Sequence, residues 1–122
     1  MYDLIIIGGG PAGVAAGVYA ARKKINTLLI TDSFGGQSLV SADVQNWIGT
    51  KSISGFDLAK NLEGHLRAQE GIEIADGDLA IGIEKINDVR LKEGQGFEVK
   101  TQSGKAFKTK YILITSVPPS AP

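Results

Sequence analysis

The chain has 122 residues, of which 43% are hydrophobic, and this suits one globular domain with a single core. Its 13 basic and 13 acidic side chains balance, and this argues against nucleic acid as the main partner. No apolar run approaches the roughly 20 residues of a membrane helix. The absence of cysteine excludes disulfides, thiolate metal sites and a dithiol redox centre from this chain. We expect a cytoplasmic protein without a membrane or metal partner.

The first part of the sequence predicts a strand, a glycine turn, a helix and a second strand. Residues 2–7 form a nearly continuous apolar run rich in isoleucine, typical of a strand buried on both faces of a parallel sheet. Three glycines follow, and Pro11 is favoured at the first position of a helix, which we expect to run to about Lys24. Residues 27–31 predict a second buried strand. A right-handed βαβ unit is the expected arrangement.

The middle of the chain predicts a long loop over residues 32–55 and a second helix. Ser54 is the expected N-cap of that helix, because Asp57 stands three residues later and apolar residues then recur at helical spacing to about Gln69. A third short strand is predicted at residues 72–74.

After Leu79 the hydrophobic period changes to two, which indicates antiparallel strands. We expect a small meander with a hairpin turn at residues 103–104, followed by one more buried strand. The strands are predicted at residues 80–87, 96–101, 105–108 and 111–115. The expected fold is therefore α/β and Rossmann-like, with helices on a parallel sheet and a small antiparallel β-meander.

The motif with chemical meaning is Gly8-x-Gly10-x-x-Gly13, the spacing of a dinucleotide-binding fingerprint. Gly8 permits a tight turn, Gly10 lets the backbone approach a pyrophosphate, and Gly13 allows close packing of helix and strand. The helix N-terminus adds free N–H groups and partial positive charge for phosphates. Asp32 lies 19 residues beyond Gly13, near the acidic position that the motif expects. The fingerprint does not choose between FAD and a nicotinamide cofactor, and a glycine-rich turn without a ligand is its structural alternative.

Four runs of residues decide between these cofactors by resemblance. They are Asp3-Leu-Ile-Ile-Ile-Gly-Gly-Gly-Pro-Ala-Gly13, Tyr19-Ala-Ala-Arg22, Gly35-Gly36-Gln37 and Val44-Gln-Asn-Trp-Ile-Gly49. Together they make residues 2–49 resemble the N-terminal segment of bacterial thioredoxin reductases and of the flavoprotein component of alkyl hydroperoxide reductase. Both belong to the pyridine nucleotide-disulfide oxidoreductases. The later residues match more loosely, as the strand meander of that family.

The resemblance implies FAD as the cofactor and assigns its contacts. It implies that the glycine turn holds the pyrophosphate, through Gly8, Gly10, Pro11, Ala12 and Gly13. The remaining contacts that it implies are Thr31 and Asp32 at the adenosine ribose, Gly36 and Gln37 along the phosphate and ribityl path, Asn46 near the flavin ring, and the backbone of Leu79 at the adenine. Many flavoproteins carry glutamate where Thr31 stands.

The resemblance also implies that parts of the complete enzyme lie outside this chain. The family places a nicotinamide domain with a Cys-x-x-Cys pair after this segment, and its chain then returns to complete the FAD domain. We expect residues 1–117 to form an FAD-binding domain that is incomplete relative to the family, and residues 118–122 to be a tail or linker. Val117 replaces a family glycine and precedes two prolines, which suggests a truncation.

The leading hypothesis is the FAD-binding part of a thioredoxin-disulfide reductase-like flavoprotein. In the complete enzyme, electrons would pass from NADPH to the flavin and then to a dithiol of a thioredoxin-like acceptor. This chain alone would not be a complete catalyst. The alternatives are a nicotinamide-binding Rossmann module and a folding fragment with little or no cofactor binding. An apolar surface left where the absent segments dock would favour a homodimer.

Overall fold

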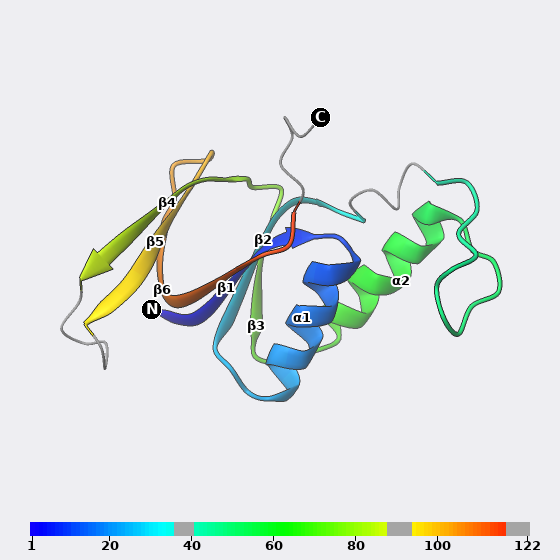
Figure 1. The fold of residues 1–122 in the computed structure, drawn as a ribbon, viewed down its shortest axis with the longest axis horizontal. Coiled ribbons are helices and arrows are strands. Elements are labelled where there is room, and N and C mark those ends of the chain that lie inside the picture. The colour runs from blue at the N-terminus through cyan, green and yellow to red at the C-terminus, as the bar shows by residue number, and fades with distance from the viewer. Residues whose placement is uncertain (36–40, 88–93, 117–122) are drawn as a thin grey trace.

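The computed structural model describes residues 1–35, 41–87 and 94–116. Within them the chain forms strands and helices that alternate in the first half and are strands alone in the second (Figure 1). The elements are β1 (Tyr2–Gly9), α1 (Pro11–Arg22), β2 (Thr27–Phe34), α2 (Gly55–Arg67), β3 (Ile72–Asp76), β4 (Ala80–Asn87), β5 (Gln95–Thr101) and β6 (Ala106–Ile114). Neither of these helices is long and apolar enough to cross a membrane.

All the described strands belong to one six-stranded sheet of order β3-β2-β1-β6-β5-β4. Strands β3, β2, β1 and β6 are parallel neighbours, while β6, β5 and β4 pair antiparallel. Figure 1 shows both helices beside β1–β3, with β4 and β5 at the opposite end of the molecule. The predicted α/β class, a parallel sheet with helices and an antiparallel meander, is confirmed.

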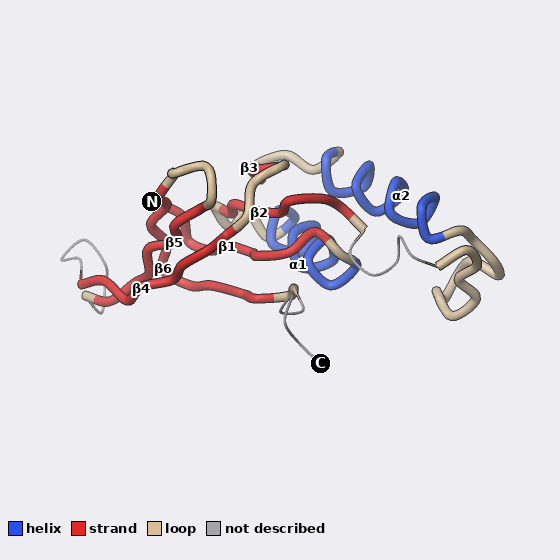
Figure 2. Tube along the Cα trace, turned by 90° about the horizontal axis from the view of Figure 1, so that it is seen from above, coloured by secondary structure: helices blue, strands red, loops and turns tan. Residues whose placement is uncertain are grey.

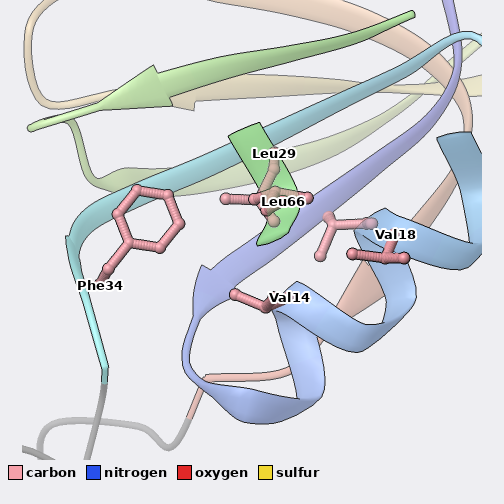
Figure 3. Packing of buried hydrophobic residues seen from close by; sticks show 6 residues of the cluster. Val14, Val18, Leu29, Phe34 and Leu66 are labelled. Atoms are coloured by element: carbon pink, nitrogen blue, oxygen red, sulfur yellow. The ribbon is translucent and has the colours of Figure 1, made fainter. Parts of the chain in front are cut away.

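The core has two parts because β1 and β2 are covered on both faces. On one face, α1 and α2 pack against the sheet (Figure 3), and this cluster consists of Ile6, Val14, Val18, Leu29, Phe34 and Leu66. On the other face, Val99 of β5 packs against the remaining side chains of β1 and β2, which are Ile5, Ile7, Leu28 and Ile30. This double burial explains the continuous apolar runs in the sequence.

One expectation about the last strands is wrong. The sequence predicts two strands at residues 105–108 and 111–115, but β6 is continuous from Ala106 to Ile114. Its first half pairs with β5 and its second half with β1, and Thr109 lies opposite a residue of each neighbour. The Thr109 hydroxyl donates to the carbonyl of Tyr111 at 3.0 Å, at the point where the strand changes partners.

The end of β6 is also less buried than expected. Tyr111 is 66% exposed and Leu113 is 42% exposed, on the face of the sheet that carries the helices. The reason is that α1 packs on β1 and β2, while α2 packs on α1 and β2. The two helices therefore leave the second half of β6 uncovered on their face of the sheet. Strand β2 is longer than predicted, because it runs past Thr31 to Phe34.

The second helix begins as predicted. The Ser54 side chain accepts a hydrogen bond from the backbone N–H of Asp57 at 3.0 Å, which caps the helix. Before it, residues 41–54 fold back on themselves through a bridge between Val44 and Ile53. Figures 1 and 2 both place this segment beyond the first turn of α2, at the side of the molecule away from β4.

Candidate nucleotide-binding site

The glycine turn after β1 is built so that side chains do not fit. Gly8 has φ +118°, a left-handed conformation that favours glycine. A Cβ on Gly8 would lie 2.5 Å from the Thr115 hydroxyl oxygen and 3.0 Å from the Ser116 nitrogen. A Cβ on Gly13 would lie only 2.0 Å from the carbonyl oxygen of Gly8. The first turn of α1 therefore packs directly on the backbone of the strand end, as the fingerprint predicts.

The N-terminus of α1 is open to a negatively charged group. Gly10 is the N-cap and has no side chain to bond the free N–H groups, and the first turn contains no acidic residue. Pro11 occupies the first helical position, and the Val14 N–H makes the first intrahelical bond to the Gly10 carbonyl at 3.0 Å. The N–H groups before Val14 have no partner within the helix, and Ala12 is exposed there. This arrangement can bind a phosphate or pyrophosphate.

The two residues expected at the ribose lie in different environments. The register between β1 and β2 shifts after Ile7, which leaves residues 31–33 as a bulge. Thr31 is buried against Gly9, and its hydroxyl donates to the carbonyl of Ser33 at 2.5 Å. Asp32 is exposed on the same bulge. The Thr31 proton is therefore committed within the protein, and Asp32 is the side chain available to a ligand.

Backbone hydrogen bonds hold this edge of the sheet together. The Gly35 N–H donates to the carbonyl of Gly9 at 3.0 Å, which brings the end of β2 beside the glycine turn. The N–H and the hydroxyl of Thr115 both donate to the carbonyl of Ile7 at 2.9 Å. The ends of β1, β2 and β6 thus meet at one carboxyl edge, where ligands of open α/β sheets bind. Gly36 and Gln37 follow Gly35 directly but lie outside the described residues.

The structure does not bring all the predicted contacts together. Asn46 is exposed on the segment 41–54, which stands apart from the turn between β1 and α1 in Figures 1 and 2. Leu79 has both backbone groups engaged, since its N–H donates to the Asp78 carboxylate at 2.9 Å and its carbonyl accepts from Gln102 at 2.8 Å. A nucleotide contact at Leu79 would use the second lone pair of that carbonyl.

Asp78 fixes the connection between β3 and β4 to the distant hairpin turn. Its carboxylate accepts hydrogen bonds from the Ser103 hydroxyl at 2.7 Å and the Ser103 N–H at 3.2 Å. Asp78 is only 8% exposed. The Ser103 hydroxyl above all lowers the pKa of Asp78 to about 2, against the opposing effect of burial. Its bonds link the β5–β6 turn to the end of β3, which itself pairs with Thr31.

Sequence reasoning missed two residues that shape the turn. Gly9 stands at a free position of the fingerprint, yet a Cβ there would lie 2.6 Å from the Thr31 hydroxyl oxygen. Its only signal is the unbroken run of three glycines. The sequence places Thr115 at the end of a strand, and no local pattern indicates that its side chain closes on Gly8 and Ile7.

This fold and this glycine turn define a Rossmann-like α/β domain. The pattern of the pyridine nucleotide-disulphide oxidoreductases matches residues 2–116. The chain belongs to this family.

Known proteins of the family match over most of the chain. NADH dehydrogenase of Bacillus subtilis is 33% identical over 115 residues, which cover 94% of this chain and 21% of that protein. A component of the alkyl hydroperoxide reductase of Escherichia coli is 35% identical over 115 residues, with the same two shares of 94% and 21%. The chain therefore spans about a fifth of the length of these curated relatives.

Solved structures show the same fold. Thioredoxin reductase of Lactococcus lactis superposes with a TM-score of 0.81 at 31% identity, covering 100% of this chain and 39% of that chain. Thioredoxin reductase of Streptococcus pyogenes gives a TM-score of 0.81 at 31% identity, covering 95% of this chain and 35% of that one. The predicted resemblance to thioredoxin reductases is confirmed.

Proposed function

We propose that this chain is the FAD-binding segment of a thioredoxin reductase-like flavoprotein, with the pyrophosphate held at the turn between β1 and α1. The observation that carries the proposal is the contact of Gly13 with Gly8, where a Cβ would lie 2.0 Å from the carbonyl oxygen. This contact places an uncapped helix N-terminus at the carboxyl edge of the sheet. Such a cradle fits the pyrophosphate of a dinucleotide.

The residues of the chain have distinct roles in this proposal. The backbone N–H groups of Ala12 and Gly13 donate to the pyrophosphate oxygens, and the absence of a side chain on Gly10 lets the phosphates come close. The Asp32 carboxylate accepts hydrogen bonds from the ribose hydroxyls. Bound FAD supplies the redox chemistry, since it accepts and passes on reducing equivalents. The dithiol that receives them is not in this chain, which has no cysteine.

Membership of the pyridine nucleotide-disulphide oxidoreductases, with thioredoxin reductases among the similar structures, supports a flavin cofactor over the alternatives. Thioredoxin reductase and alkyl hydroperoxide reductase are both reductases, and their matched chains resemble this one over nearly its whole length. NADPH as the electron donor and a thioredoxin-like acceptor belong to the same proposal and concern the complete enzyme. Residues 1–117 would then form the FAD-binding domain, and residues 118–122 a tail or linker.

Titration of nucleotides into the purified, flavin-free chain tests the proposal. Calorimetry with FAD should show saturable one-to-one binding, and NADPH should bind more weakly or not at all. Gly10→Val is the informative variant, because Gly10 has φ −79° and ψ −173°, an extended conformation that valine adopts readily. Its side chain should block the phosphates, with the fold kept.

Three other outcomes would contradict the proposal. Preference for NADPH over FAD would indicate a nicotinamide-binding module. No binding of either nucleotide by a chain with a folded circular dichroism spectrum would indicate a fragment that keeps the fold of the family without its cofactor. Equal FAD affinity of the wild type and Gly10→Val would place the binding site elsewhere on the chain.

A further inference from the structure

Arg67, the last residue of α2, makes three contacts with one guanidinium group. Its Nε lies 2.9 Å from a carboxylate oxygen of Glu63, and its Nη2 lies 2.8 Å from a carboxylate oxygen of Asp76. The Cζ atom of the guanidinium lies over the ring of Phe34, 5.3 Å from the ring centroid. The guanidinium therefore has partners on three different elements, which are Glu63 of α2, Asp76 of β3 and Phe34 of β2.

Two of these contacts reach the strand ends that border the candidate site. Phe34 is the last residue of β2 and lies opposite Gly9 in the sheet, with its ring directed toward Leu66 in Figure 3. The next residue, Gly35, donates its N–H to the Gly9 carbonyl at 3.0 Å. Asp76 is the last residue of β3 and lies opposite Thr31. Arg67 thus ties the ends of β2 and β3 to the end of α2.

The exposure of these groups separates a positioning role from a stabilising one. The Arg67 side chain is 43% exposed and its partner carboxylate at Asp76 is 46% exposed. Ion pairs this accessible to water add little to the stability of a folded protein. What they fix is geometry, because the planar guanidinium holds two carboxylates and an aromatic ring in one arrangement.

We propose that Arg67 is a positioning residue for nucleotide binding, which holds the exit of β2 at Phe34 and Gly35 against the glycine turn. The inference rests on the proposed function, since it assigns Arg67 to the site where the FAD pyrophosphate and ribose would lie. Arg67 itself does not touch the nucleotide. Loss of its contacts lets Phe34 and Gly35 move away from Gly9, and this loosens the wall of the site without unfolding the domain.

The test compares Arg67→Gln and Arg67→Lys with Lys60→Gln in the full chain. Lys60 is the matched control, because it lies on the same helix and its Nζ lies 5.6 Å from the ring centroid of Phe56, which belongs to α2 and not to β2. FAD affinity should fall about fivefold in Arg67→Gln, the loss expected for one such aromatic contact. Arg67→Lys keeps the positive charge but loses the planar group with several N–H donors, so its FAD affinity should lie between those of Arg67→Gln and the wild type. Lys60→Gln should bind FAD as the wild type does.

A second measurement follows the position of Gly35 itself and needs no FAD. Hydrogen exchange of the Gly35 amide, followed by NMR, should be faster in Arg67→Gln than in the wild type and unchanged in Lys60→Gln. Equal Gly35 exchange in all three proteins would overturn the inference. An FAD affinity that falls equally in Arg67→Gln and Lys60→Gln would also overturn it.

Failure of the proposed function would look different. If the wild-type chain binds no FAD, the proposed function is refuted, and so is the part of the inference that concerns nucleotide binding. The Gly35 exchange rate then still decides whether Arg67 holds the exit of β2.

Discussion

Three glycines on the two helices allow a graded test of how the glycine turn is packed. A Cβ on Gly13 would meet the Gly8 carbonyl oxygen at 2.0 Å, and this neighbour is backbone. A Cβ on Gly17 would meet the Leu66 Cδ1 atom at 2.7 Å, the far end of a flexible side chain. A Cβ on Gly64, a position of α2, would have nothing within 4 Å. Replacement of each by alanine should therefore have different effects.

The expected changes in the free energy of unfolding follow from these neighbours. Alanine is favoured over glycine inside a helix by about 1 kcal/mol, so Gly64→Ala should stabilise the protein by about that amount. Overpacking costs about 1–3 kcal/mol, and more where the neighbour cannot move. After the gain in helix propensity, Gly13→Ala should lose about 2 kcal/mol or more and Gly17→Ala about 0–1 kcal/mol. For a domain of this size, a loss of about 2 kcal/mol lowers Tm by about 8 °C.

Thermal and urea unfolding followed by circular dichroism measure this series. The predicted order of stability is Gly64→Ala, wild type, Gly17→Ala and Gly13→Ala, with unchanged urea m values. A Gly13→Ala protein as stable as Gly64→Ala would refute the reasoning, because it would mean that the first turn of α1 does not rest on Gly8.

Three further predictions concern stability. The pKa of Asp78 is held at about 2, below its usual range near 3.9, so the stability from Asp78 is present above about pH 4 and is lost as the pH falls toward 2. Asp78→Asn should therefore flatten the pH dependence of the urea midpoint in that window. Leu66 is fully buried between the helices and the sheet, so Leu66→Ala should cost about 2–5 kcal/mol in urea unfolding; a loss below about 1 kcal/mol would contradict the packing. Ser54→Ala removes the cap of α2 and should cost about 1 kcal/mol, while Ser54→Asp should retain most of it.

The features that could be predicted from the sequence are those set by local sterics. Gly8 is predictable because its left-handed φ favours glycine, and Gly13 because the helix contacts the strand end too closely for a side chain. Both requirements recur at the fixed spacing of the fingerprint. Ser54 is predictable because a capping bond closes within three residues. The order of strands and helices follows from hydrophobic period, which changes where the parallel part of the sheet gives way to the meander.

The features that were missed depend on residues far apart in the chain. Thr115 closes on Ile7 across 108 positions, and no local pattern records that contact. Strand β6 is continuous because it pairs first with β5 and then, from Thr109 onward, with β1. In the sequence, this change of neighbouring strand resembles a break between two short strands. Thr31 is buried and Asp32 is exposed because a bulge shifts the register between β1 and β2 at these residues. The role of Arg67 needs three elements to be assembled first.

The central claim, that FAD binds with its pyrophosphate at the turn between β1 and α1, is tested most directly by NMR of the amide groups during FAD addition. The largest chemical-shift changes are expected at the N–H groups of Ala12 and Gly13, with smaller ones at Asp32. The amides of Gly64 and Gly104, on α2 and on the β5–β6 turn, should stay unchanged. Saturable FAD binding that leaves Ala12 and Gly13 unshifted, and instead perturbs residues away from the carboxyl edge of the sheet, would contradict the account.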